Sequence, residues 1–159
     1  MADREKYATF YLGNICFGLA ALRVQEVLER LDIVTVPLAP KALPGMINLR
    51  GQILPVLDLR ERLKLPANDS QQAADARMVV VRTGEGLISL LIDRVGEILD
   101  VDSSLFEEPS ETLQPALLEV TIHVCKLEGK LLLVLDTEKV LTLPKEKTAA
   151  EPALEPAEA

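Results

Sequence analysis

Few residues of this chain have the type and spacing that catalysis needs. Its only histidine, His123, offers neither a pair of imidazoles for zinc nor more than one candidate for the base of a catalytic triad. It lies in the apolar run 120–124, where a strand histidine that faces solvent or a hydrogen-bond partner is the simpler interpretation. The turn 84–86 lacks the lysine and the helix start of a phosphate-binding loop. The sequence therefore predicts no catalytic triad, metal site or nucleotide site.

Three aspartates and two cysteines also have interpretations that involve no reaction. Asp58, Asp93 and Asp136 each follow an apolar run at a different strand end, so we expect them to cap or turn the chain rather than to form a carboxylate pair. Cys16 and Cys125 are isolated in apolar surroundings, which predicts reduced, buried thiols rather than a disulfide or a redox switch. The chain is thus predicted not to be an enzyme and to bind no cofactor.

The stronger candidates for function are polar groups that interrupt an apolar segment. Asn48 and Arg50 lie between apolar residues, and burying such groups without partners costs about 1–3 kcal/mol each. One interpretation is an internal Arg50–Glu26 ion pair together with an Asn48 that satisfies the turn at Arg50 and Gly51. The other is direct contact with a partner protein. The two are compatible, because a guanidinium can brace a strand edge and also present that edge to a partner.

Composition limits the class of protein. The net charge of −8 opposes a phosphate-neutralising surface, and the aromatic content of 3% leaves little material for base stacking, so nucleic-acid binding is not expected. The chain of 159 residues suits one compact domain, or two small ones that share a core. The charged start lacks the apolar segment of a secretion signal, and no apolar run approaches the length of a membrane span. We expect a cytoplasmic protein without direct membrane insertion.

The segments that must position these residues occur as two similar copies in the sequence. Residues 50–66 align with residues 128–144, and residues 13–29 align with residues 84–100 in the same order. Two matches in one order indicate duplication of a single unit. We therefore expect one domain, 1–143, that contains two repeats at about 7–66 and 76–143, joined by a loop at 66–75 that is poor in periodic pattern. The remaining residues 144–159, rich in Pro, Ala and Glu, are predicted to be a disordered acidic tail.

Glycine-centred turns mark the expected strands. Gly13-Asn14, Arg50-Gly51 and Glu128-Gly129 each separate two apolar runs, which predicts hairpins. The last of these hairpins is expected to pair residues 117–127 with residues 131–135. Many short strands with such turns, written twice, favour a mainly β fold of two small antiparallel barrels packed together.

Three further segments complete this expected organisation. Residues 22–28 fit a short helix and an alternating strand equally well. Short helices are expected after Asp58, which has Glu61 three residues on as a capping box requires, and after Asp136.

Several of these segments resemble one known family. The central run N-L-R-G followed by P-V-L-D-L-R is highly specific, and the likeness covers nearly everything from Tyr7 to Leu143. The chain resembles the CheW-like family of bacterial chemotaxis couplers in residues 10–12, 24–27, Pro37 before Gly45, 46–51, 53–60 and 91–95.

The resemblance implies two five-stranded SH3-like β-barrels around a shared hydrophobic core, with short helices and no catalysis. It implies an adaptor that couples the cytoplasmic tips of methyl-accepting chemotaxis receptors to the regulatory domain of a CheA-type histidine kinase. Such a protein is cytoplasmic and is recruited through its partners to chemoreceptor arrays at the membrane. The resemblance assigns Val24, Glu26 and Gly45 to partner binding, and Arg50 and Gly51 to its signature turn. Together with Asn48, these are the predicted partner-binding residues.

Two alternatives remain open at this point. One keeps the fold and places the coupler in a CheA-like pathway other than flagellar chemotaxis. The other is a small-ligand protein that uses the cleft between the barrels, with Glu26, Arg50 and Asp93 as polar anchors. In addition, His123 stands opposite Gly45 in the repeat alignment, so the second repeat is not expected to reproduce a close approach that Gly45 permits.

Overall fold

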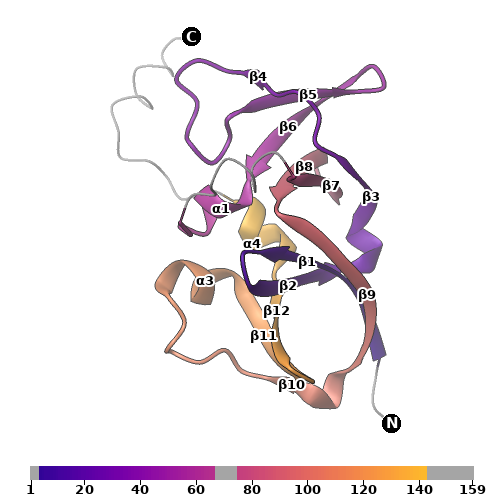
Figure 1. Cartoon of the computed structure of the whole chain (residues 1–159), viewed down its shortest axis with the longest axis vertical. Coiled ribbons are helices and arrows are strands. Elements are labelled where there is room, and N and C mark those ends of the chain that lie inside the picture. The colour runs from indigo at the N-terminus through magenta and orange to yellow at the C-terminus, as the bar shows by residue number, and fades with distance from the viewer. Residues whose placement is uncertain (1–3, 67–74, 143–159) are drawn as a thin grey trace.

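The computed structural model of the chain describes residues 4–66 and 75–142, and these form mainly strands (Figure 1). The strands of the first repeat are β1 (Arg4–Leu12), β2 (Ile15–Ala20), β3 (Val24–Glu29), β4 (Val34–Thr35), β5 (Gly45–Leu49) and β6 (Gln52–Asp58). Those of the second repeat are β7 (Arg77–Thr83), β8 (Gly86–Ile92), β9 (Arg94–Asp102), β10 (Phe106–Glu107), β11 (Thr121–Leu127) and β12 (Lys130–Leu135). The short helices are η1 (Ala21–Arg23), α1 (Leu59–Arg62), η2 (Ser103–Leu105), α3 (Pro115–Val120) and α4 (Thr137–Leu141).

The described strands form two six-stranded sheets, and each sheet contains strands of both repeats. The first sheet has the order β10-β11-β12-β2-β1-β9, and the second has the order β3-β7-β8-β6-β5-β4. In each sheet, the opening hairpin of one repeat is inserted among the four later strands of the other. The insertion is made by two parallel pairings, β2 with β12 and β6 with β8. In Figure 1, β9 runs along one side of the molecule from the level of β7 and β8 to the level of β10.

This topology confirms the mainly β class and corrects its details. Each sheet has six strands rather than the five that the resemblance implied, and neither sheet is a purely antiparallel unit built from one repeat. Among the described strands, the hydrogen-bonded order of each sheet ends at two edges, so neither sheet closes into a barrel. Periodic sequence predicts which strands form hairpins, but it does not say to which copy a hairpin attaches.

Three apolar cores follow from this arrangement. The central core lies between the sheets and takes residues from both repeats, among them Phe10, Phe17, Leu57, Leu90 and Leu133. Each sheet also has its own core on its other side, formed in the second sheet by Ile47, Leu49, Leu54, Val56, Met78 and Val80 and in the first by Tyr7, Cys16, Val101, Cys125, Leu132 and Val134. Both cysteines are free and buried, as predicted.

Local sequence signals explain most of the turns and helix starts. Hairpins turn at all the glycine-containing sites predicted, and the ambiguous segment 22–28 contains part of η1 followed by β3. Asp58 caps α1, because its carboxylate accepts from the amides of Arg60 and Glu61, and Asp136 caps α4 through the amide of Lys139. Burial, as the largest cause, raises the pKa of the Asp58 carboxyl.

One predicted strand is wrong at its start. Residues 115–120 form the helix α3, and the strand of that hairpin begins only at Thr121. Pro115 occupies the first turn of the helix, where its fixed φ is favourable, and Leu117 and Val120 reach the central core from one helical face. Apolar residues recur on both sides of Thr121, so the sequence does not mark this change of period.

Some expectations lie outside the described residues. They are the inter-repeat loop, apart from Pro66 and Asp75, and the acidic tail. Within the described ranges, no helix has both the length and the apolar character that a membrane crossing requires.

Cutting the backbone between residues 66 and 75 should give two fragments that do not fold separately. Each fragment lacks two of the six strands of one sheet, four of the six strands of the other, and about half of the residues of the central core. We expect no cooperative thermal transition by circular dichroism for either fragment, and a restored transition when they are mixed in equal amounts. A cooperative melt of one fragment alone would contradict the interdependence of the repeats.

Ser89→Ala should raise the free energy of unfolding. The Ser89 hydroxyl is fully buried without a hydrogen-bond partner, at a position opposite Val56 and Val80 of the second sheet's core. Removing an unpaired hydroxyl from an apolar site should stabilise by about 1 kcal/mol, or about 2–4 °C in Tm. Ser104→Ala, at an exposed position, is the control for calorimetry and should leave Tm unchanged. A lower Tm for Ser89→Ala would show that the hydroxyl does have a partner.

Candidate functional site

The candidate site lies where the edge strand β3 meets the tip of the β5–β6 hairpin. Three strands separate β3 from β5 in the hydrogen-bonded order of the second sheet, yet Arg50 at the hairpin tip donates to the carboxylate of Glu26 on β3. The sheet must curl around its own core to allow this contact. The Arg50–Glu26 ion pair, which one of the two sequence interpretations predicted as an internal pair, is therefore present but lies at the surface, across the open side of the curled sheet.

The hairpin turn holds Arg50 in an uncommon backbone conformation. Arg50 has a φ of 49° and Gly51 a φ of 89°, which are the two positive values of a type I′ turn. The left-handed conformation costs an L-residue such as arginine about 1 kcal/mol, whereas glycine adopts it freely. The Asn48 side chain accepts from the amide of Gly51 at 2.8 Å and so closes the turn. Asn48 is thus used internally, while Arg50 is directed out of the sheet.

The ion pair leaves most of the arginine accessible. The side chain of Arg50 is 68% exposed and that of Glu26 is 28% exposed. Exposed pairs contribute about 0–1 kcal/mol to stability, because water and salt screen them. The pair can therefore orient the guanidinium without being essential to the fold.

An apolar strip that the sequence reasoning missed lies beside the hairpin tip. Val34, Met46 and Pro55 are paired across β4, β5 and β6, so their side chains share one face of the sheet. Ile53 continues this face from its position opposite Asn48. Val34 is 69% and Ile53 59% exposed, although both lie in regular strands. In residues 45–57, apolar residues occur on the outer face of the strands as well as on the face toward the core. This excess of apolar residues is the signal that could have identified the strip.

Two of the predicted site residues have internal roles. Val24 is half-buried and packs against the central core. Gly45 is buried, and a Cβ atom there would lie 2.0 Å from the backbone oxygen of Val34 and 2.9 Å from the side chain of Ile33. The close approach that Gly45 permits is therefore that of the chain's own strand β4. The structure links Glu26 to Arg50 and Asn48 to Gly51, whereas Val24 packs on the central core and Gly45 packs against β4.

The second repeat does not reproduce the site. Glu128 stands where the first repeat has Arg50, and His123 stands where it has Gly45. His123 is half-buried and stacks on Phe106 with ring centroids 4.6 Å apart and nearly parallel planes. At the tip of the β11–β12 hairpin, the Lys130 ammonium donates to the Tyr11 hydroxyl at 2.7 Å, and this hydrogen bond raises the pKa of Lys130. The Arg50–Glu26 ion pair is thus specific to the first repeat.

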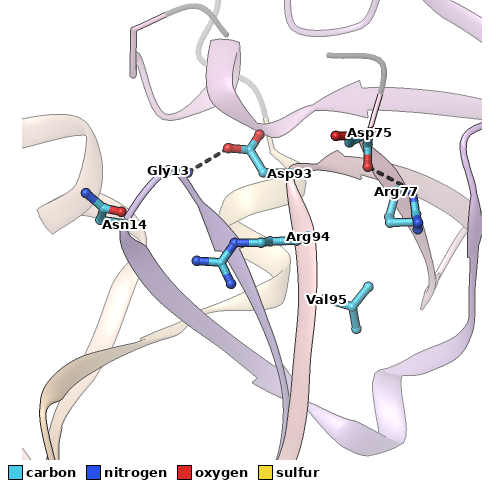
Figure 2. A pocket seen from close by; sticks show the side chains of 7 residues that line it. All are labelled: Gly13, Asn14, Asp75, Arg77, Asp93, Arg94 and Val95. Atoms are coloured by element: carbon cyan, nitrogen blue, oxygen red, sulfur yellow. Dashed lines mark hydrogen bonds between the residues drawn. The ribbon is translucent and has the colours of Figure 1, made fainter. Parts of the chain in front are cut away.

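A cavity elsewhere does not assemble the predicted small-ligand anchors. Its volume is about 610 Å³, and it is lined by Gly13, Asn14, Asp75, Arg77, Asp93, Arg94 and Val95 (Figure 2). The Asp93 carboxylate accepts from the amide of Gly13 at 2.6 Å and from the Arg60 guanidinium. Glu26 and Arg50 do not line this cavity. The three anchors of the small-ligand alternative are therefore not brought to one site, and the described residues contain no cluster suited to a metal ion.

Comparison with known proteins gives one consistent family. The CheW-like domain family matches this chain over residues 6–145. The chemotaxis protein CheW of Treponema pallidum is 24% identical over 142 residues, which cover 88% of this chain and 84% of that protein. CheW of Bacillus subtilis is 26% identical over 146 residues, covering 91% and 92%. The crystal structure of the scaffolding protein TtCheW from Thermoanaerobacter tengcongensis, 24% identical, covers 92% of this chain and 99% of its own with a TM-score of 0.78, a likeness of fold.

Gly45→Ala should destabilise the protein, because the added Cβ would displace β4 from β5. The expected loss in the free energy of unfolding is about 1–3 kcal/mol, as for other overpacked sites. Gly84→Ala is the matched control, since a Cβ at Gly84 would meet no atom within 4 Å. Chemical denaturation of both variants measures the difference. Equal stability of Gly45→Ala and the wild type would show that β4 can move away without cost.

Proposed function

The chain belongs to the CheW-like domain family, and from this premise we propose that it is a non-enzymatic adaptor that couples methyl-accepting chemotaxis receptors to a CheA-type histidine kinase. The observation that carries the proposal is the exposed Arg50, which Glu26 orients beside an apolar strip. Together they form a surface of fixed shape with an apolar centre and a charged rim. Interfaces of moderate, reversible affinity commonly have this composition.

The geometry suits recognition of protein surfaces better than chemistry on a small molecule. The carboxylates that follow the apolar runs are engaged: Asp58 and Asp136 cap helices, and Asp93 pairs with Arg60. An extended segment of a partner could pair with the edge strand β3 and add a strand to the second sheet. The apolar strip could contact one face of a partner's helix. Receptor tips are helical and the kinase domain is a homologous β fold, so the two kinds of surface match the two proposed partners.

The proposed location follows from the proposed partners. We place the protein in the cytoplasm, where it would be held at the membrane-associated receptor arrays by protein contacts alone. Its net charge of −8 opposes direct adsorption to anionic lipid headgroups.

Arg50→Ala should weaken binding without unfolding the protein. We expect the Kd for the kinase regulatory domain, the receptor cytoplasmic fragment, or both to rise at least tenfold in calorimetric titrations, a change of about 1.4 kcal/mol. Tm should fall by no more than about 3 °C, because the Arg50–Glu26 pair is exposed. Glu128→Ala, which changes the same turn position of the second repeat, is the control.

Three results would count against this prediction in different ways. No saturable binding of the wild type to either partner would refute the proposed function. Unchanged affinity for both partners in Arg50→Ala would remove the hairpin tip from the interface. Loss of the cooperative melt in Arg50→Ala would assign the ion pair a structural role.

A further inference from the structure

The chain passes between the two sheets twice in the described residues. The first passage is η1, which connects β2 of the first sheet to β3 of the second. The second is at Asp93, which connects β8 of the second sheet to β9 of the first. At each passage, an ion pair joins the connecting residues to the short helix that follows the last strand of a repeat, which is α1 after β6 or α4 after β12. Arg23 pairs with Glu138 of α4, and Asp93 pairs with Arg60 of α1.

These two ion pairs occupy corresponding places in the repeats but differ in polarity and burial. Arg60 and Glu138 align in the repeats, so the helix supplies the cation at one passage and the anion at the other. The side chains of Arg60 and Asp93 are 13% and 10% exposed, whereas those of Arg23 and Glu138 are 32% and 66% exposed. The Arg60 pair is thus shielded from solvent, and the Arg23 pair is largely screened by it.

The Arg60 pair has several directional hydrogen bonds. Arg60 donates through Nε to Asp93 Oδ1 at 3.1 Å and through Nη2 to Oδ2 at 2.5 Å, which is the two-point geometry of a guanidinium on a carboxylate. Asp93 Oδ2 also accepts from the amide of Gly13 at 2.6 Å, in the β1–β2 turn of the first sheet (Figure 2). Arg60 Nη1 donates to the backbone oxygen of Pro66 at 2.5 Å. Four segments of the chain therefore meet at the Arg60–Asp93 ion pair.

A second arginine of α1, Arg62, binds the end of α4. Arg62 is 5% exposed and donates to three backbone oxygens around the end of α4, which follows β12 of the first sheet. These are Val140 at 2.8 Å, Lys139 at 2.7 Å and Thr142 at 3.0 Å. The single-turn helix α1, which directly follows β6 of the second sheet, is therefore fastened to the first sheet's elements by two guanidinium groups.

We propose that Arg60 and Arg62 of α1 are positioning residues that fix the relative orientation of the two sheets. Apolar packing in the central core favours contact between the sheets but specifies their angle weakly, because it is non-directional. Planar guanidinium groups with two or three fixed acceptors specify that angle. A buried ion pair adds little net stability, so orientation is the property that the joint supplies.

The proposal is tested on the protein alone, without partners. Spin labels on cysteines introduced at Gln52 and Lys126, exposed positions of the second and first sheet, report the inter-sheet distance distribution by pulsed electron resonance. Cys16 and Cys125 are 1% and 0% exposed and should not react. Arg60→Lys keeps the charge and removes the planar fork, and it should at least double the width of the distribution. Arg23→Lys at the exposed counterpart pair is the matched control and should leave the width unchanged.

Arg62→Lys is the second variant and should also broaden the distribution. Unchanged widths in both α1 variants, or equal broadening in Arg23→Lys, would overturn the proposal. Failure of both Arg60→Lys and Arg62→Lys to give a cooperative melt would also overturn it, because the arginines would then be required for folding rather than for orientation.

Discussion

The parallel pairing of β2 with β12, and of β8 with β6, is the constraint on which the rest of the structure depends. Each pairing inserts the opening hairpin of one repeat among the strands of the other. A unit of about 60–70 residues buries a smaller share of its surface when it folds alone than a domain of about 150 residues does. The exchange compensates for this, because both repeats contribute to a central core that neither could form. It also requires the chain to cross between the sheets, which explains why buried charged groups gather at one of the crossings.

The same exchange determines where the candidate site forms. The strands β7 and β8 of the second repeat lie between β3 and β6 of the first, and Met78 and Val80 of β7 belong to the core around which the second sheet curls. The curl brings Glu26 to Arg50 across the open side of the sheet. Both residues of the Arg50–Glu26 ion pair therefore belong to the first repeat, but the curl of the sheet that brings them together depends on strands of the second repeat.

Sequence reasoning succeeded where the determinant is local. Glycine-centred turns and aspartate caps act within a few residues, so the hairpins and the starts of α1 and α4 could be identified, and the Arg50–Glu26 pair was one of two stated alternatives. It failed where the determinant is distant. Nothing in either repeat says that its first hairpin pairs with the other copy, and apolar residues recur on both sides of Thr121, so the sequence does not mark the change from α3 to β11. The role of Gly45 was also hidden, because β4 approaches it from another part of the chain.

The divergence of the two repeats is informative because their topology is the same. Each repeat must hold a two-residue edge strand, β4 or β10, against the strand that follows it. The first repeat does so by bringing the backbone of β4 against Gly45, and the second by stacking His123 on Phe106 of β10. The structural requirement is met in both, so the different surfaces that result are not needed for folding. Packing constrains the cores of both repeats but leaves the hairpin tips free to differ. The tips are therefore where the two repeats present different side chains, as Arg50 and Glu128 do.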